Sequence, residues 1–531
     1  MMSTTASVTD YLGLREALFC ALLCATVIYL KHLRRYNDYW KKQNVVHEEF
    51  DLSWAPISKM LAKPIHEIDM DRHRKHGNIF GAFEGLHPTL FLSDPDLIKL
   101  VLVKHFDDFP DRRTVTLNDP ILDNMMTVVC AKCWRKICPA SSPAFTAGKL
   151  RKMSAIIHDC AQVTSEHLVG LAKEGRDLHP KEFFGHYALD VITRCVLRAR
   201  LGSHTPEADE FVAKSQAAFA VKPMPALVFF FYIWTLFPFM TTLLRLQVFI
   251  PETFVFLKNF CVSVIEKRQL SSGKRQDFLQ MMVDAQGVKM QVPAEDPLDS
   301  EEKLYSPGTV QTVENSTKGL TEEEALSQCI AFFIAGLDTI SSVLAFTSYL
   351  LALHPDVQKK LRAEVDRCFN ENGEVPSLDD VSKLKYLNCV ISESLRLYPP
   401  AVRVERTACR DVTLGNSGIK LCRGCAVVIP VYAMHHDPEY FPDPEKFDPE
   451  RFSDENVGSV RPYSYLPFGA GPRNCIGMRF ALQALKTCLL HVVHTVELVQ
   501  TENTKVPLKM VTTFSLLTAE DITIGVRNRN M

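Results

Sequence analysis

The sequence has little net charge, no internal repeat and no long low-complexity linker. Its 531 residues carry a formal net charge of −2, so nothing in the charge indicates binding to nucleic acid. Neither a nicotinamide-binding nor a flavin-binding fingerprint is present. Length alone would allow several domains, but a hydrophobic content of 47% without linkers also fits one large domain.

Sixteen cysteines are scattered along the chain, and two Cys-x-x-Cys pairs stand out, Cys130/Cys133 and Cys422/Cys425. As zinc ligands they would form a four-sulfur site from two distant segments. Because Cys422 and Cys425 fall in a predicted strand–turn–strand, this interpretation is disfavoured.

The stretch 467–478 concentrates three glycines and two prolines around a single cysteine. Since glycine permits positive φ and proline fixes φ, the stretch predicts an irregular loop. An apolar helical pattern follows it, so Cys475 lies at a loop-to-helix junction, where free backbone N–H groups and the helix dipole favour a thiolate. A loop that binds phosphate is the alternative, but the spacing of Gly469, Gly471 and Gly477 matches neither the dinucleotide nor the P-loop pattern.

A long apolar helix is predicted upstream of this loop. Thr321-Glu-Glu-Glu324 matches a capping box, and the apolar run continues to Leu353, a helix of roughly 50 Å. Inside it, Gly336 costs roughly 1 kcal/mol relative to alanine, and Asp338 adds the cost of desolvating an acid. Small residues let a planar ligand approach, and the Thr339 hydroxyl can open the helix locally. A harmless glycine beside an exposed aspartate is the alternative.

Glu393-Ser-Leu-Arg396 forms an i,i+3 pair on another predicted helix. The same pattern occurs at Glu364-Val-Asp-Arg367, where we expect a solvated surface pair. The first pair is followed by Tyr398-Pro-Pro400, and Asp448-Pro-Glu-Arg451-Phe452 lies between it and the cysteine loop. This context sets the two pairs apart.

The chain begins with an apolar run, Ala17–Leu30, followed by a basic cluster at 31–35. Counted from Tyr11, the run reaches the ~20 residues that span a bilayer. Since no small-residue cleavage site follows, residues 1–35 are predicted to be an uncleaved N-terminal membrane signal anchor rather than a signal peptide. The positive charge after the run places the body on the cytoplasmic side, where cysteines stay mostly reduced.

The remaining segments are assigned from local pattern. Residues 36–65 are predicted to be a polar linker, and 285–320, polar and acidic, a surface insert. A hairpin is expected from about 79 to 92, followed by a helix with Asp94 as N-cap and Pro95 at its first position. Amphipathic helix is expected from about 149 to 220.

The loop Phe468-x-x-Gly471-x-Arg473-x-Cys475-x-Gly477 resembles the haem-thiolate loop of the cytochromes P450, and Ala335-Gly-Leu-Asp-Thr339 resembles the oxygen-activating motif of that family. The similarity runs from about residue 65 to the end. Ser142–Leu150 and Pro472–Leu482 are similar to the microsomal family 3 enzymes, which oxidise drugs and steroids, and to thromboxane synthase. The resemblance implies the cytochrome P450 fold, mostly α with a small β-rich part, with 66–531 as the haem-thiolate catalytic domain.

By this resemblance the cofactor is haem b, with Cys475 as the axial iron ligand. The thiolate pushes electron density onto iron and favours O–O cleavage. Thr339 would hydrogen-bond dioxygen and Asp338 would help to relay protons. Glu393, Arg396 and Arg451 correspond to a buried ion-pair triad behind the haem. Further residues assigned to the cofactor are Arg473, Phe468, Arg406, Arg112 and Trp134.

The residues that the resemblance assigns to substrate are all apolar, which predicts a lipophilic small molecule. Ordinary core packing is the alternative for each. These residues are Val128, Ile334, Ala335, Ala401 and Val402. The uncharged stretch 223–244 is long enough to span a membrane, but Pro223, Pro225 and Pro238 argue against a smooth helix. By resemblance it is a membrane-dipping roof over the substrate channel, and buried core is the alternative.

The sequence departs from the family pattern at one position. Family members carry a basic residue four positions after the tryptophan equivalent to Trp134, whereas this chain has Cys138. Positions i and i+4 share a helix face, so Arg135 is expected to point elsewhere. One charge-assisted bond to a haem propionate is therefore missing, and we expect weaker haem binding.

The implied reaction consumes substrate, O2, two electrons and two protons and gives hydroxylated substrate and water. Without a nicotinamide or flavin site, the electrons must come from a partner. In microsomal relatives this is an NADPH-dependent flavoprotein reductase on the endoplasmic reticulum membrane, and cytochrome b5 is a further candidate. A basic docking patch is expected, with a solvated helix face as the alternative. Its residues are Lys132, Arg135, Lys136, Lys149, Arg151 and Lys152.

Two rival functions use the same cofactor. A haem-thiolate isomerase or dehydratase would rearrange a peroxide without a reductase, but the Asp338-Thr339 pair argues against it. A haem-binding protein with little catalysis is suggested by Cys138.

Overall fold

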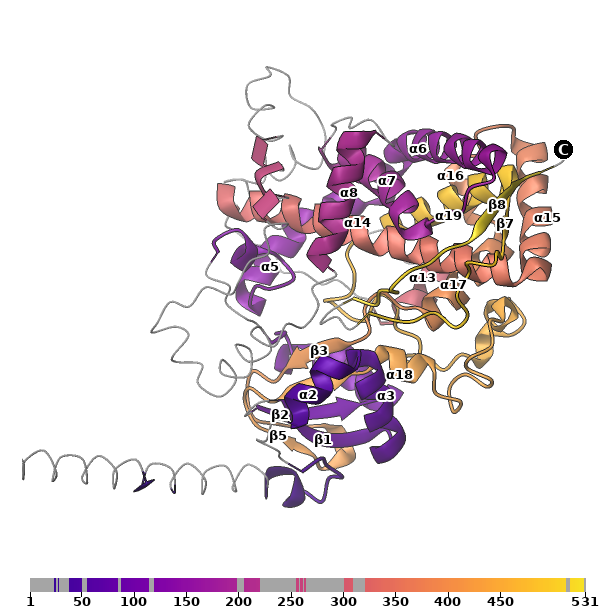
Figure 1. Ribbon diagram of the computed structural model, residues 1–531. Helices are drawn as coiled ribbons and strands as arrows, with labels where there is room; N and C mark the ends of the chain where they lie inside the picture. Colours follow the sequence, from indigo (N-terminus) through magenta and orange to yellow (C-terminus); the bar gives the residue numbers. More distant parts are fainter. Residues whose placement is uncertain are drawn as a thin grey trace, which may run out of the picture.

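The computed structural model describes residues 23–24, 27, 38–49, 55–84, 87–113, 119–197, 205–219, 255–256, 258–260, 262–263, 300–308, 320–511 and 516–529. Helices form most of it, with small sheets and loops between them (Figure 1), which confirms the predicted fold class. The α-helices are α2 (Ala55–Ala62), α3 (Ile65–His76), α4 (Pro95–Lys99), α5 (Ala131–Ser141), α6 (Ala147–Glu174), α7 (Pro180–Ile192), α8 (Pro206–Phe219), α13 (Ser300–Tyr305), α14 (Glu322–Leu353), α15 (Pro355–Asn372), α16 (Leu378–Ser382), α17 (Lys385–Leu397), α18 (Val431–His435) and α19 (Met478–Thr495). The strands are β1 (Ile79–Glu84), β2 (His87–Leu92), β3 (Val404–Thr407), β4 (Val412–Thr413), β5 (Lys420–Leu421), β6 (Ala426–Ile429), β7 (Val496–Val499) and β8 (Gly525–Asn528).

Helix α14 crosses the helical part of the molecule, with α6, α7 and α8 on one side and α17 and α19 nearby (Figure 1). It starts at the predicted capping box: the Glu324 amide donates to Thr321 Oγ1 at 3.2 Å, and the Thr321 amide donates to Glu324 Oε2 at 2.7 Å. Of the described helices, only this one is long and apolar enough to cross a membrane, but 78% of its apolar window is buried inside the protein. It is therefore the central core helix.

The largest sheet has the strand order β1-β2-β6-β3 and lies apart from α14 in Figure 1, beside α2, α3 and α18. Strands β1 and β2 pair from Ile79↔Leu92 to Glu84↔His87, which confirms the predicted hairpin. Asp94 then caps α4 by accepting bonds from the amides of Asp96 and Leu97. Strand β6 joins this hairpin to β3 and so brings the 404–407 segment beside the N-terminal strands.

The linker prediction for 36–65 is wrong for residues 38–49. Trp40 is fully buried and its indole Nε1 donates to the Ala82 carbonyl at 3.1 Å. A Cβ at Gly81 would lie 2.3 Å from the Trp40 ring, so the strand needs glycine there to admit the indole. The polar residues around Trp40 led to the linker prediction, but the buried Trp40 side chain fixes this segment on the sheet.

The surface-insert prediction for 285–320 is wrong for residues 300–308. Tyr305 and Ser306 are fully buried. The Tyr305 hydroxyl lies 2.7 Å from Ser392 Oγ on α17, and Arg479 on α19 pairs with Glu302 through bonds of 2.7 and 2.8 Å. The acidic composition of the segment predicted a solvent-exposed loop, whereas Glu302 forms an ion pair with Arg479 beside the cysteine loop. The predicted membrane anchor, 1–35, falls almost entirely outside the described residues, and the apolar stretch 223–244 falls wholly outside them.

Candidate active site

The cysteine loop precedes α19 and is held by its own backbone. The Cys475 amide donates to the Phe468 carbonyl at 2.9 Å, and Gly471 has a φ of +72°. A Cβ at Gly471 would stand 1.9 Å from the Leu102 carbonyl oxygen, so only glycine fits there. The loop therefore presents Cys475 at a fixed place beside the N-terminus of α19.

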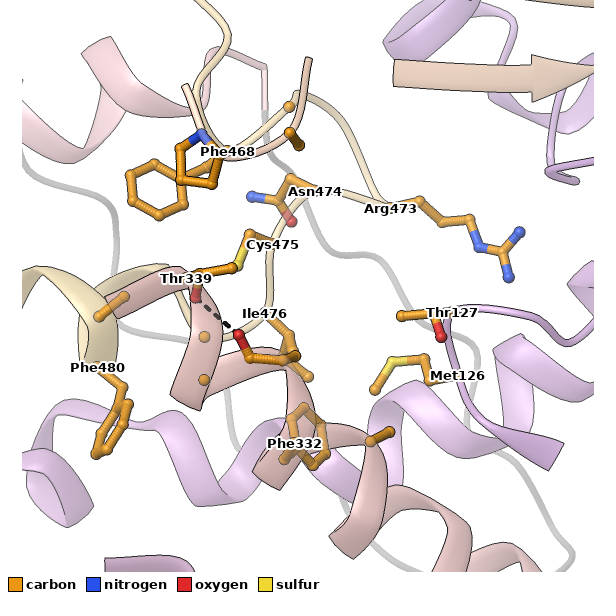
Figure 2. A pocket seen from close by; sticks show the side chains of 18 of the residues that line it. Met126, Thr127, Phe332, Thr339, Phe468, Arg473, Asn474, Cys475, Ile476 and Phe480 are labelled. Atoms are coloured by element: carbon orange, nitrogen blue, oxygen red, sulfur yellow. Dashed lines mark hydrogen bonds between the residues drawn. The ribbon is translucent and has the colours of Figure 1, made fainter. Parts of the chain in front are cut away.

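Cys475 faces a cavity of about 600 Å³. Figure 2 shows Cys475 and the α14 residue Thr339 among the side chains around it. Ala335 and Gly336 of α14 line the same cavity. A Cβ at Gly336 would lie 2.7 Å from Ile192 Cδ1 on α7, so this glycine also permits the close packing of α14 on α7. The sequence-predicted loop and helix thus meet across one cavity.

The Thr339 hydroxyl donates to the Ala335 carbonyl at 2.7 Å, drawn as the dashed line in Figure 2. Asp338, its neighbour, does not line the cavity and is 2% exposed. Its carboxylate Oδ1 instead accepts a bond of 2.6 Å from Lys181 Nζ on α7. The two residues of the predicted pair therefore point in different directions.

Lys181 was not anticipated from the sequence. Besides the carboxylate, its ammonium donates to the Asp338 carbonyl at 3.1 Å and to Ser342 Oγ. A cation next to Pro180 in the first turn of a helix opposes the helix dipole. That unfavourable placement is a signal from which a buried anionic partner could have been suspected.

Three arginines line the cavity beside the loop: Arg406 and Arg473 are buried and Arg112 is half-buried. Burial lowers the pKa of all three. The other two guanidinium groups lower the pKa of Arg406 further, and Arg112 helps to bring that of Arg473 to about 10. Arg406 Nε is buried and has no hydrogen-bond partner among the described residues. An anionic group in the cavity would relieve the repulsion between the three guanidinium groups and would accept a hydrogen bond from Arg406 Nε. The residues present therefore fit the carboxylates of haem.

Arg473 is anchored by main-chain carbonyls. Its Nη1 donates to Pro110 at 2.8 Å and its Nη2 to Val129 at 2.9 Å, while its guanidinium carbon lies 5.1 Å from the ring centroid of Trp134. Trp134 and Cys138, one helical turn apart on α5, both line the cavity. Arg135 points away and pairs with Asp107 at 2.6 Å, as predicted. The family's usual basic position is thus occupied by a buried thiol at the cavity wall.

The loop backbone favours a thiolate at Cys475, as expected, but burial of the sulfur opposes it. Cys475 is accessible from the cavity but lies deep in the domain. Burial raises the pKa of its thiol, and the Gly477 amide and the Arg112 charge offset this only in part. The desolvation cost of the anion exceeds the help from the loop. A metal cation at the sulfur would reverse the balance.

Behind the loop, the structure brings together the predicted triad. Glu393 and Arg396 are fully buried and joined by two bonds of 2.8 Å, and Arg451 Nε lies 3.4 Å from Glu393 Oε1. Burial raises the pKa of Glu393, against the effect of Arg396. Arg396 also donates to the His435 carbonyl, and His435 Nε2 accepts the Leu466 amide at 2.9 Å. The triad is therefore connected by hydrogen bonds to the start of the cysteine loop.

Of the residues predicted to contact substrate, Ala335 and Ala401 line the cavity, whereas Val128, Ile334 and Val402 do not. Ile334 precedes Ala335 and is rotated by about 100° around the helix, into the core. Val402, next to Ala401, is likewise buried in the core, and near Val128 it is Met126 and Thr127 that line the wall.

Apolar residues of α14 that the sequence analysis missed complete the wall. Phe332, Ile340 and Val343 repeat at helical spacing around Ala335 and Thr339, and that periodicity could have identified them. The other wall residues, Met126, Phe480 and Leu516, come from different segments, and no sequence periodicity identifies them as cavity residues.

The family model for cytochrome P450 matches residues 54–524. Among curated proteins, the chain is 36% identical to mouse cytochrome P450 3A41 over 489 residues, 91% of each chain. It is 36% identical to human cytochrome P450 3A5 over 472 residues, 87% of each chain, and 36% identical to rat cytochrome P450 3A9 over 453 residues, 84% of each.

Proposed function

The chain belongs to the cytochrome P450 family, with relatives in family 3, and on that premise we propose that it inserts one oxygen atom of O2 into a lipophilic small molecule at the endoplasmic reticulum membrane. As a P450 monooxygenase it uses haem with thiolate-ligated iron. The electrons come from NADPH through a flavoprotein reductase. The observation that carries the proposal is the cavity shared by Cys475, Thr339 and the apolar side chains of α14.

Haem, when bound, supplies the activation of dioxygen, which thiolate ligation assists. Cys475 would ligate the iron, while Arg112, Arg406 and Arg473 would bind the propionates. Gly336 and Ala335 leave room for a planar group beside α14. The Thr339 hydroxyl holds a proton at Oγ1 at the cavity wall, where general acid chemistry needs it.

Substrate would occupy the space along α14. Phe332, Ile340 and Val343 present hydrocarbon surface there, and Phe145 extends the same wall. Burying such surface favours apolar ligands by roughly 25 cal/mol per Å². These walls support a lipophilic substrate.

Reductase docking on the cysteine side is supported by part of the predicted basic patch. Arg135, Lys136 and Arg151 already pair with acids of this chain. Lys132, Lys149 and Lys152 have no ion pair within the described part of the chain. We expect their combined reversal to glutamate to slow reduction by the reductase at low salt but not reduction by dithionite, with Lys75→Glu on α3 as the control. Unchanged kinetics would place docking elsewhere.

The function is tested with purified protein, reductase and NADPH in lipid vesicles and a panel of lipophilic compounds. NADPH- and substrate-dependent oxygen consumption with an oxygenated product is expected. Because Asp338 points away from the cavity, a lipid peroxide is included without NADPH. Turnover of the peroxide alone would favour the isomerase or dehydratase, and absence of both activities would favour a haem-binding role.

A further inference from the structure

The pair Cys130/Cys133 has no part in the oxygenase chemistry, yet its sulfurs lie together. Cys130 is the N-cap of α5, and its Sγ is 3.8 Å from Cys133 Sγ in the next turn. Cys130 is exposed and Cys133 half-buried, so a small reagent can reach the pair from solvent. Two accessible thiols at this separation need only a small side-chain movement to form a bond.

The second Cys-x-x-Cys pair is a built-in contrast. Cys422 and Cys425 occupy the predicted turn between β5 and β6, with Gly424 at a φ of +85°. Cys425 is fully buried and burial raises the pKa of its thiol. The first pair therefore has an exposed cysteine, Cys130, at the start of α5, whereas in the second pair Cys422 is half-buried and Cys425 is fully buried.

We propose that Cys130 and Cys133 form a reversible dithiol–disulfide site that reacts with low-molecular-weight disulfides of the glutathione class. The Cys130 thiolate attacks the reagent, forms a mixed disulfide and releases one thiol. Cys133 then attacks Cys130 Sγ and releases the second thiol. In sum, two protein thiols and one disulfide give one protein disulfide and two small thiols.

The surroundings of Cys133 suit the second step. Burial raises the pKa of this thiol, and so do the hydrogen bond and charge of Cys130, whereas Lys136 lowers it. Converting Cys130 to a mixed disulfide removes its contribution. Cys133 then ionises more readily, at the moment when it must act as the nucleophile.

The site is coupled to the cofactor wall through the backbone. The Val129 carbonyl, next to Cys130, accepts the Arg473 bond, and the Ala131 amide donates to Asp111 Oδ1 at 2.5 Å. Closing the disulfide pulls on Cys130 between these two contacts. Oxidation is therefore expected to speed loss of haem from the protein, through Arg473.

The test equilibrates the purified haem-loaded protein with glutathione buffers of increasing oxidation, followed by differential alkylation and tryptic mass spectrometry. Cleavage after Lys132 separates the two cysteines, so the bond appears as two linked peptides. The expected result is a link between Cys130 and Cys133 that dithiothreitol reverses, with Cys425 unmodified. Cys133→Ser should instead keep a mixed disulfide on Cys130.

The exposed cysteine Cys409 is the matched control, because it can carry a mixed disulfide but does not belong to a Cys-x-x-Cys pair. Cys409→Ser should leave the link intact. The proposal is overturned if both cysteines stay reduced in buffers that modify Cys409, if wild-type protein stops at the mixed disulfide, or if Cys130 links to another cysteine. Haem release is recorded in the same samples, and an equal rate in both forms would remove the coupling to Arg473.

Discussion

The two walls of the cavity are built in different ways. The cysteine side is fixed by charge and main-chain bonds from distant segments: the Glu393–Arg396 pair, His435 and the arginine cluster all support it. The α14 side is one apolar helix, and its acid Asp338 is tied outward to Lys181. A wall that must hold a metal ligand needs many constraints, whereas a wall that admits varied apolar substrates needs a smooth surface.

Breaking the Glu393–Arg396–Arg451 triad, which supports the cysteine side, is expected to have the largest effect, a loss of stability. Arg396→Leu leaves Glu393 fully buried and without its main partner, which should cost about 3–5 kcal/mol of unfolding free energy. Urea denaturation measures it. Arg367→Leu is the control: Arg367 is exposed, and its predicted partner Glu364 instead accepts the amides of Tyr386 and Leu387. Equal losses for the two variants would mean that the triad does not support the loop.

On the opposite wall, Thr339→Ala should act on chemistry and not on folding. Removing the hydroxyl from the cavity takes away a positioned proton, so product formation should fall by up to about 10²-fold while peroxide release rises. Product and peroxide per NADPH are measured. Ser341→Ala, on the same helix but bonded to the Asp338 carbonyl, should change neither. A Thr339→Ala enzyme with normal yield would remove this role.

Lys181→Met tests whether the ion pair between Lys181 and Asp338 stabilises the fold. The carboxylate would stay buried, and its Oδ2 already has no hydrogen-bond partner among the described residues. A loss of about 1–3 kcal/mol in stability is expected. Adding Asp338→Leu should recover much of it, because no charge then remains unpaired. An additive double mutant would show that the pair is not coupled.

The smallest effect is expected at Cys138, at the edge between the two walls. Cys138→Arg supplies the missing donor but also adds a charge near three arginines, so haem affinity should rise by less than about 1 kcal/mol. Haem transfer to apomyoglobin measures the release rate. Cys138→Ser, which adds no charge, is the control, and equal retention in wild type and both variants would sink the claim that this position weakens haem binding.

Local signals account for what the sequence could predict. The capping box at Thr321, the Asp94 cap and the glycines of the cysteine loop depend on neighbours within a few residues. What it missed depends on contacts between distant segments. Lys181 meets Asp338 only after α7 packs on α14, and Trp40 finds its place only against Gly81. The acidic composition predicted a solvent-exposed Glu302, because its ion pair with Arg479 also joins distant segments.

The central claim is that Cys475 ligates haem iron in this cavity. The most direct measurement is the absorption spectrum of the reduced, carbon-monoxide-bound protein. Wild type should show the Soret band typical of thiolate ligation, and Cys475→Ala should lose that band while folding normally by circular dichroism. A thiolate-type band that persists in Cys475→Ala would contradict the assignment, and so would a wild-type protein that binds haem without that band.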